Sequence, residues 1–111
     1  MPIKSEVIAN TKSERVHRVS ELADRKGRER SGRFMVEGPQ SVRELLTWHP
    51  GLVEDLYVEV ESAQPDASFA TPAVAQMAGK AMQSGVYVHK VTHAVMHRMS
   101  ADAQGLSLIH I

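Results

Sequence analysis

The side chains most suited to chemistry in this sequence are the basic ones between positions 25 and 33, where the chain reads RKGRERSGR. These nine residues contain five basic side chains and one acidic side chain. Arginine guanidinium groups bind phosphate through paired hydrogen bonds and stack on nucleic-acid bases, and glycines let a backbone approach closely. The segment therefore predicts a phosphate-contacting surface. The alternative interpretation is a solvated basic loop without a dedicated partner.

The charges of the chain are segregated along it. Residues 1–33 contain nine basic and five acidic side chains, whereas residues 34–111 contain four basic and eight acidic ones. The total charge is therefore zero, although the first segment carries a net charge of +4. Aromatic side chains that could stack on bases are missing beside the basic segment, apart from Phe34, which we expect in the core. This pattern favours recognition of a folded RNA by charge and shape over a stacking platform for a single strand.

Three histidines, His89, His93 and His97, are spaced by four residues and could bind zinc if one continuous helix carried them. His89 falls in a predicted strand, however, and no cysteine or well-placed carboxylate completes a tetrahedral set. We therefore expect a polar helix face and no metal site. The sequence also lacks a G-x-S-x-G motif, a P-loop and a dinucleotide-binding glycine motif, so no catalytic or cofactor-binding residue is predicted.

The length and composition predict one small globular domain. With 111 residues, of which 42% are hydrophobic and 23% charged, the chain can bury a core without a metal or a disulfide. No apolar stretch approaches the roughly 18 residues needed to cross a bilayer, and the first residues lack the apolar segment of a secretory signal. We therefore expect a cytoplasmic protein, which the absence of cysteine also favours.

Hydrophobic spacing and turn residues predict four helices that alternate with three strands. The predicted helices lie near 13–23, 39–48, 72–84 and 92–99, and the predicted strands near 34–36, 56–60 and 86–91. The connections are long enough for crossovers, so we expect an α/β fold with a small, mostly parallel sheet covered by helices. The methionines on the predicted buried faces are interpreted as core residues, namely Met77, Met82, Met96 and Met99.

A longer motif includes the basic segment. From Leu22 to Leu46 the chain reads LADRKGRERSGRFMVEGPQSVRELL, which resembles the N-terminal substrate-binding domain of the SpoU (TrmH-type) RNA 2'-O-ribose methyltransferases. In that family a helix with a V-x-x-L face leads into a basic R-K-x-R run and then into a strand ending in F-x-V-E-G. The matching positions here are 19–22, 25–28 and 34–38. The later strands and the MSADAQG segment follow the family's order, so the resemblance covers about residues 10–105.

The resemblance implies an α/β domain, similar in fold to a class of ribosomal RNA-binding proteins, that presents structured RNA to a catalytic domain. In such enzymes a trefoil-knotted domain follows, forms the homodimer, binds S-adenosylmethionine and methylates a ribose 2'-hydroxyl. This chain carries no such domain, so we expect it to be inactive alone, to bind no S-adenosylmethionine and to be monomeric. Its partner is expected to be structured RNA, and above all rRNA. The predicted RNA-binding residues are Arg15, Arg18, Arg25, Lys26, Arg28, Arg30 and Arg33.

The predicted domain organisation has three parts. Residues 1–9 are expected to be a tail and residues 10–105 the RNA substrate-binding domain. The last six residues, LSLIHI, form an apolar end without a polar tail and resemble a translated sequencing adaptor, so we interpret 106–111 as a non-native or truncated tail. Two alternatives stay open at this point: a stand-alone RNA-binding or ribosome-associated module without catalytic activity, and a metal-binding or purely structural protein.

Overall fold

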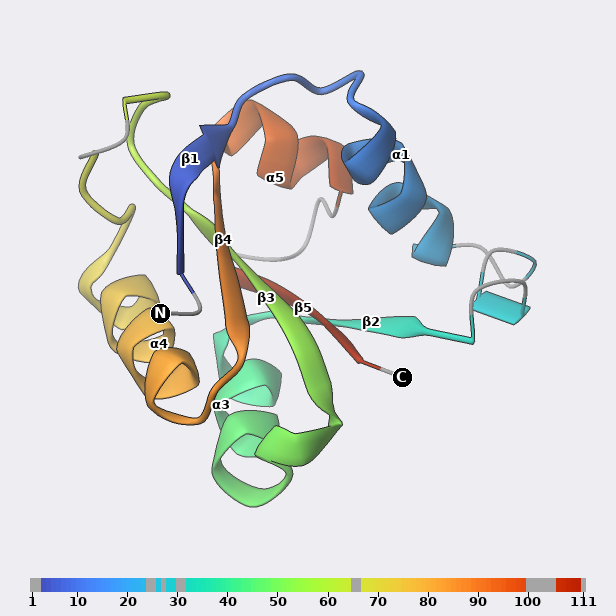
Figure 1. Cartoon of the computed structure of the whole chain (residues 1–111), viewed down its shortest axis with the longest axis vertical. Helices are drawn as coiled ribbons and strands as arrows, with labels where there is room; N and C mark the ends of the chain where they lie inside the picture. Colours follow the sequence, from blue (N-terminus) through green and yellow to red (C-terminus); the bar gives the residue numbers. More distant parts are fainter. Residues whose placement is uncertain are drawn as a thin grey trace.

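The computed structural model describes residues 3–23, 26, 28–29, 32–64, 67–99 and 106–110 of the chain. Strands in these residues are β1 (Ile3–Ile8), β2 (Phe34–Glu37), β3 (Val53–Glu59), β4 (Tyr87–Val91) and β5 (Leu106–His110). The α-helices are α1 (Glu14–Ser20), α3 (Pro39–Trp48), α4 (Pro72–Gln83) and α5 (His93–Met99). Two short 3-10 helices, η1 (Glu21–Ala23) and η2 (Pro50–Leu52), follow α1 and α3 (Figure 1).

The five described strands form one sheet in the order β1-β4-β3-β5-β2. The strands β1, β4 and β3 pair in parallel, whereas β5 is antiparallel to both of its neighbours, β3 and β2 (Figure 1). The predicted α/β class and the small parallel sheet flanked by helices are therefore confirmed. The antiparallel strand makes the sheet mixed, which the sequence did not predict.

Both ends of the described chain take part in the sheet, although the sequence predicted a tail at each. Within the predicted tail 1–9, β1 pairs with the edge of β4. Within the predicted tail 106–111, β5 separates β2 from β3 and pairs with both. Unpaired backbone groups of a neighbouring strand are costly when buried, and these two segments supply the missing partners. The boundaries of the substrate-binding domain at 10 and 105, and the non-native origin of LSLIHI, stay predictions.

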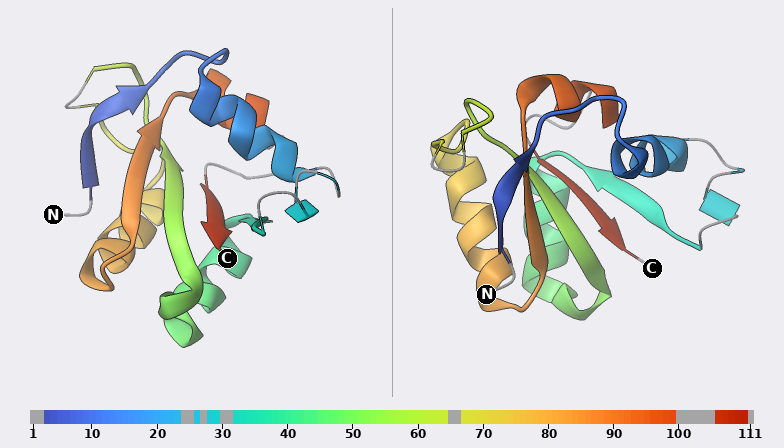
Figure 2. Two further views of the ribbon diagram at one scale, coloured as in Figure 1. Left: turned by 45° about the vertical axis from the view of Figure 1, so that its right-hand side comes forward. Right: turned by 45° about the horizontal axis from the view of Figure 1, so that its top comes forward.

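Helices cover both faces of the sheet (Figure 2). Each face has its own hydrophobic core. The first core lies between α3, α4 and one face, and its strand residues include Leu56, Val58 and Val88. The second lies between α1, α5 and the other face, and it contains Tyr57 and Val91. Because successive side chains of a strand point to opposite faces, β3 contributes to both cores.

Local signals in the sequence set most helix boundaries. Ser13 caps α1 and Thr71 caps α4, each through a side-chain oxygen that accepts a backbone N–H three residues later. Gly38 precedes α3 with φ 90° and ψ 151°, a conformation that is open to glycine and strained for other residues. The longest described helix, α4, has 12 residues, and no helix in the described part of the chain is long and apolar enough to span a membrane.

The methionines lie where the sequence placed them. Met77 belongs to the first core, and Met96 and Met99 belong to the second. Met82 is partly buried against the first core. Their interpretation as flexible core residues is confirmed.

Shortening a buried leucine tests the first core. Leu56 on β3 is completely buried, so we expect Leu56→Ala to lower the free energy of unfolding by about 2–5 kcal/mol through lost burial and a residual cavity. Urea unfolding followed by circular dichroism measures this change.

The matched control is Leu52→Ala, because Leu52 is 49% exposed and lies just before the same strand. We expect that variant to stay within about 0.5 kcal/mol of the wild type. Equal losses at the two positions would contradict the assignment of Leu56 to the core.

Candidate nucleic-acid interface

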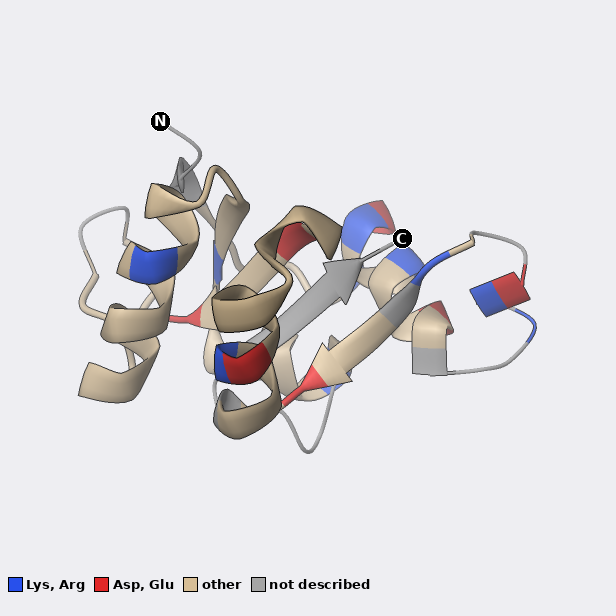
Figure 3. Ribbon diagram, turned by 90° about the horizontal axis from the view of Figure 1, so that it is seen from below, with Lys and Arg blue, Asp and Glu red and all other residues tan. Residues whose placement is uncertain are grey.

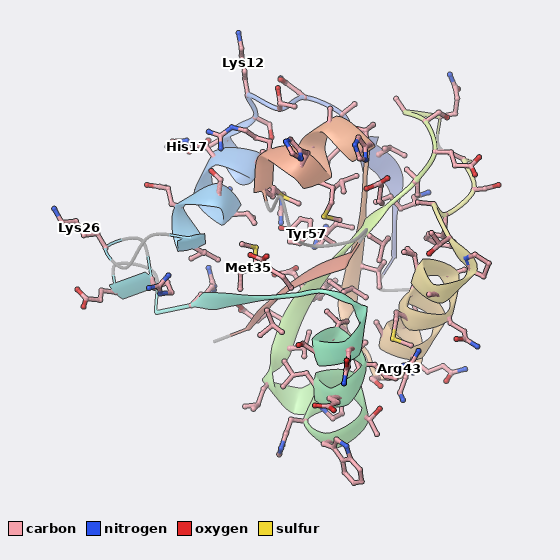
Figure 4. All side chains as sticks on the ribbon, turned by 180° about the vertical axis from the view of Figure 1, so that it is seen from behind. Lys12, His17, Lys26, Met35, Arg43 and Tyr57 are labelled. Atoms are coloured by element: carbon pink, nitrogen blue, oxygen red, sulfur yellow. The ribbon has the colours of Figure 1, made fainter. Side chains whose placement is uncertain are left out.

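The basic residues that the structure describes between positions 15 and 33 lie along the ribbon from α1 to the start of β2, on one side of the molecule (Figure 3). Lys26, Arg28 and Arg33 are exposed, and Lys26 extends away from the body of the domain (Figure 4). Arg25 and Arg30 lie outside the described residues. The structure thus places five of the seven predicted RNA-binding residues, namely Arg15, Arg18, Lys26, Arg28 and Arg33.

Two of these arginines, Arg28 and Arg33, contact neighbouring parts of the chain. The Arg33 guanidinium forms a fork on the Glu54 carboxylate, with Nε 2.6 Å from Oε2 and Nη2 3.3 Å from Oε1. Arg28 Nη1 donates to the Leu22 carbonyl at 3.1 Å. These contacts are exposed or half-buried, and exposed ion pairs stabilise a fold by at most about 1 kcal/mol. They orient the side chains, and phosphate oxygens can replace them at small cost.

Arg18 differs from these two because it points to solvent from the middle of α1. Its partner is Glu14 one turn earlier, with Nη1 3.7 Å from Oε1, and both side chains are more than half exposed. A pair of this kind at i,i+4 supports the helix by a few tenths of a kcal/mol, roughly 0.3–0.5. This weak pair does not fix the Arg18 side chain in one conformation.

Arg28 and Arg33 line a hollow between η1 and β2, together with Met35 and Glu37. Glu37 forms a half-buried, acidic part of this hollow's wall.

A polar network that the sequence did not predict lies on the α1 and α5 face of the sheet. Arg15 Nη1 donates to the Tyr57 hydroxyl at 3.0 Å, and the Tyr57 ring stacks on the His89 ring with centroids 4.9 Å apart. His89 Nε2 lies 2.6 Å from Asp55 Oδ1. Tyr57 is 1% exposed and His89 is 5% exposed. Strand alternation places Asp55 and Tyr57 on one face, but only the parallel register brings His89 beside them.

The network holds Arg15 and Tyr57 in fixed charge states. The hydrogen bond to Tyr57 raises the pKa of Arg15 above its usual value. Burial raises the pKa of Tyr57 above its usual value of 10.0, and the bond from Arg15 opposes that rise. At neutral pH a charged guanidinium therefore lies against a neutral phenol.

The histidines do not converge. His89 lies in β4, while His93 and His97 lie on α5 and stack with ring centroids 6.4 Å apart. His93 Nδ1 is 3.1 Å from Glu59 Oε2, whereas the partner of His89 is Asp55. Among the residues that the structure describes, no group of three potential ligands could hold a metal ion.

A family model assigns the domain. The model of the MRM3-like substrate binding domain matches residues 13–106, from the Ser13 cap of α1 to the first residue of β5. The chain belongs to this family. No curated protein sequence matches it. The resemblance to the substrate-binding domains of SpoU-type methyltransferases is thereby confirmed.

Solved structures share the fold of this MRM3-like domain. An rRNA methyltransferase from Sinorhizobium meliloti superposes with a TM-score of 0.70 at 21% identity, over 99% of this chain and 37% of that one. A structure described as an RNA 2'-O ribose methyltransferase superposes with a TM-score of 0.67 at 22% identity, over 93% of this chain and 36% of that one. The MRM3-like chain thus spans little more than a third of the length of each.

The buried phenol predicts a pH dependence. As the pH rises above about 10, the unfolded chain releases the Tyr57 proton while the folded protein keeps it, so the unfolded state binds fewer protons and stability falls. This contribution is fully present below about pH 10 and is lost as the pH rises toward the folded-state pKa.

We expect the free energy of unfolding to fall more steeply between about pH 9 and about pH 11 in the wild type than in Tyr57→Phe, which keeps the ring but cannot ionise. Chemical denaturation at a series of pH values measures both slopes. Parallel curves for the two proteins would show that the folded state does not hold this phenol protonated.

Proposed function

We propose that this MRM3-like domain is the RNA-recognition part of an S-adenosylmethionine-dependent RNA 2'-O-ribose methyltransferase, and that its substrate is rRNA. The observation that carries the proposal is the position of the basic residues from α1 to the start of β2, on one side of a substrate-binding domain (Figure 3). The names of the two similar structures, an rRNA methyltransferase and an RNA 2'-O ribose methyltransferase, support the choice of substrate.

Charge rather than stacking is the proposed mode of recognition. Each arginine or lysine that binds a phosphate displaces condensed counterions, which makes binding strong at low salt and nearly independent of sequence. The exposed large hydrophobic side chains of the described residues are Trp48, Leu52 and Tyr87, which belong to α3, η2 and β4 and not to the basic segment. A folded RNA presented through its phosphates fits this arrangement better than an unstacked strand.

We propose that the methyl donor, S-adenosylmethionine, binds to another part of a longer protein. One structure of the Sinorhizobium meliloti enzyme is described as AdoMet-bound. In open α/β sheets a nucleotide cofactor usually lies at the carboxyl ends of the parallel strands, against glycine-rich turns. Here Ala9, Val60 and Thr92 follow β1, β3 and β4, so the described residues do not fit such a cofactor. We therefore propose that this domain alone transfers no methyl group. We also propose that the whole protein is a cytoplasmic homodimer.

A stand-alone RNA-binding or ribosome-associated module is the second candidate. It predicts the same RNA-binding surface and differs in what the gene encodes after Gly105. An open reading frame that continues into a glycine-rich α/β domain supports the methyltransferase. A stop codon there supports the separate module.

The salt dependence of RNA binding tests the basic surface. We expect the wild-type chain to bind fluorescein-labelled RNA hairpins derived from rRNA, with an affinity that falls steeply as salt rises. Changing Arg28 and Arg33 to Ala should weaken binding and lower the magnitude of the salt slope by about 0.7–0.9 for each lost phosphate contact. Fluorescence anisotropy at several salt concentrations measures affinity and slope together.

The matched control changes Arg43 and Lys80 to Ala, because both lie on the α3 and α4 side and the double variant removes the same charge. We expect it to keep nearly the wild-type slope. Equal effects of the two double variants, with both proteins folded by circular dichroism, would show that net charge alone governs binding. An absence of effect in both would leave the basic segment a solvated loop.

A further inference from the structure

A second hollow lies between the β1–α1 connection and β4, separate from the one beside β2. Its polar wall consists of Asn10, Ser13, Arg15 and His89, and the rest of it is aliphatic chain at the end of β1. We propose that this hollow binds a phosphate group of the RNA, with Arg15 as the charged ligand and Tyr57 as the residue that positions Arg15. The inference rests on the proposed function, because RNA is the source of the phosphate.

Arg15 is held differently from Arg18 and Arg33. Arg18 pairs with Glu14 and Arg33 pairs with Glu54, whereas Arg15 donates to the neutral hydroxyl of Tyr57. Within the described part of the chain, Arg15 has no carboxylate in ion-pair contact. A guanidinium carries five N–H groups in a planar fork that matches the oxygens of a phosphate. One of these N–H groups donates to Tyr57. The positive charge of Arg15 is therefore available to a ligand.

The nearest acidic side chain on this face has another partner. Asp55 is bound by His89, with Nε2 2.6 Å from Oδ1. Its charge acts on Arg15 only through space, as the weakest of the influences that keep this guanidinium protonated. The Asp55 carboxylate therefore has a hydrogen-bond partner of its own and forms no ion pair with Arg15 among the described residues.

The two small polar residues of the wall offer donors to the hollow. Asn10 Oδ1 accepts the Lys12 N–H at 2.9 Å, and Ser13 Oγ accepts the Val16 N–H at 3.2 Å. Their oxygens are therefore engaged as acceptors. The Asn10 amide N–H groups and the Ser13 hydroxyl hydrogen have no acceptor among the residues that the structure describes. Together with Arg15 they form a set of donors, which suits an anion with several acceptor oxygens.

Tyr57 fixes the position of Arg15 before any ligand arrives. The phenol is 1% exposed, and its ring belongs to the second core and stacks on the His89 ring. A hydrogen bond to such a rigid group restricts a long side chain that would otherwise sample many rotamers. The ordering cost is then met in the free protein rather than on binding, which strengthens the complex.

The wall of the hollow includes Asn10, Ser13 and Arg15 at the start of α1, and the basic segment follows the end of the same helix, so one RNA can contact both. The helix has seven residues, which at about 1.5 Å per residue spans roughly 10 Å. Arg18 lies along the helix between them. A continuous phosphate backbone could therefore run from Arg15 past Arg18 to Arg28.

The experiment compares single variants of the full 111-residue chain for binding to a fluorescein-labelled RNA hairpin. We expect Arg15→Gln to weaken binding by roughly tenfold or more, the effect of losing a charge-assisted hydrogen bond. Its salt slope should fall by about 0.7–0.9. The control is Lys12→Gln. Lys12 precedes Arg15 by three residues, is exposed and lies outside the hollow's wall, and the substitution removes the same charge. We expect less than about a twofold effect there.

The role of Tyr57 is tested by a double-mutant cycle. Tyr57→Phe keeps the ring and its stack on His89 but removes the hydroxyl, so we expect weaker RNA binding with the charge of Arg15 unchanged. The same substitution should have no further effect in the Arg15→Gln protein, because a positioning residue acts only through the residue it positions. Additive effects would instead indicate a structural role. Thermal unfolding of each variant confirms that it is folded.

Titration with inorganic phosphate separates the two sources of the ligand. Chemical-shift changes at Asn10, Ser13 and Arg15 that the RNA hairpin abolishes by competition support the inference. If Arg15→Gln matches Lys12→Gln while the Arg28 and Arg33 variant still loses affinity, the inference fails and the proposed function stands. If inorganic phosphate binds the hollow while the wild type binds no RNA, both fail, and the hollow is a site for free phosphate.

Discussion

The parallel pairing of β3 with β4 is the contact on which the other layers of this domain depend. It sets Leu56 beside Val88 on one face and Tyr57 beside His89 on the other. Because strand side chains alternate, a slip of one residue would carry Tyr57 into the aliphatic core and Leu56 toward the polar network. One register therefore maintains two cores of different chemistry, and it also sets where Arg15 finds its partner.

Stability and recognition are assigned to different parts of the molecule. The buried aliphatic side chains between the sheet and its helices supply the hydrophobic stabilisation, and they require no charge. The basic side chains lie outside these cores, in contacts such as Arg33 with Glu54 that cost little to exchange. The protein can thus concentrate positive charge on one side, where like charges repel, without weakening the interior.

Tyr57 is the residue that joins the two parts. Its ring belongs to the core under α1 and α5, and its hydroxyl holds the guanidinium of Arg15 at the surface. A buried phenol needs a hydrogen-bond partner, and an arginine at the rim meets that need while keeping its charge available. The polar group that the core must satisfy is therefore the same group that orients a basic side chain.

The sequence by itself determined the features that depend on near neighbours. The helix caps at Ser13 and Thr71 and the alternation along β3 involve residues a few positions apart, and the structure confirms the elements they predict. The family motif is equally local, and the match to the family model confirms it. The role of the basic run stays a prediction. The terminal strands, the mixed sheet and the register of β3 on β4 were decided by tertiary structure alone. The same holds for the contacts of Tyr57 with Arg15 and of Asp55 with His89, which join residues 42 and 34 positions apart. Strand pairing of this kind depends on which distant backbone groups satisfy one another, and no local pattern encodes that choice.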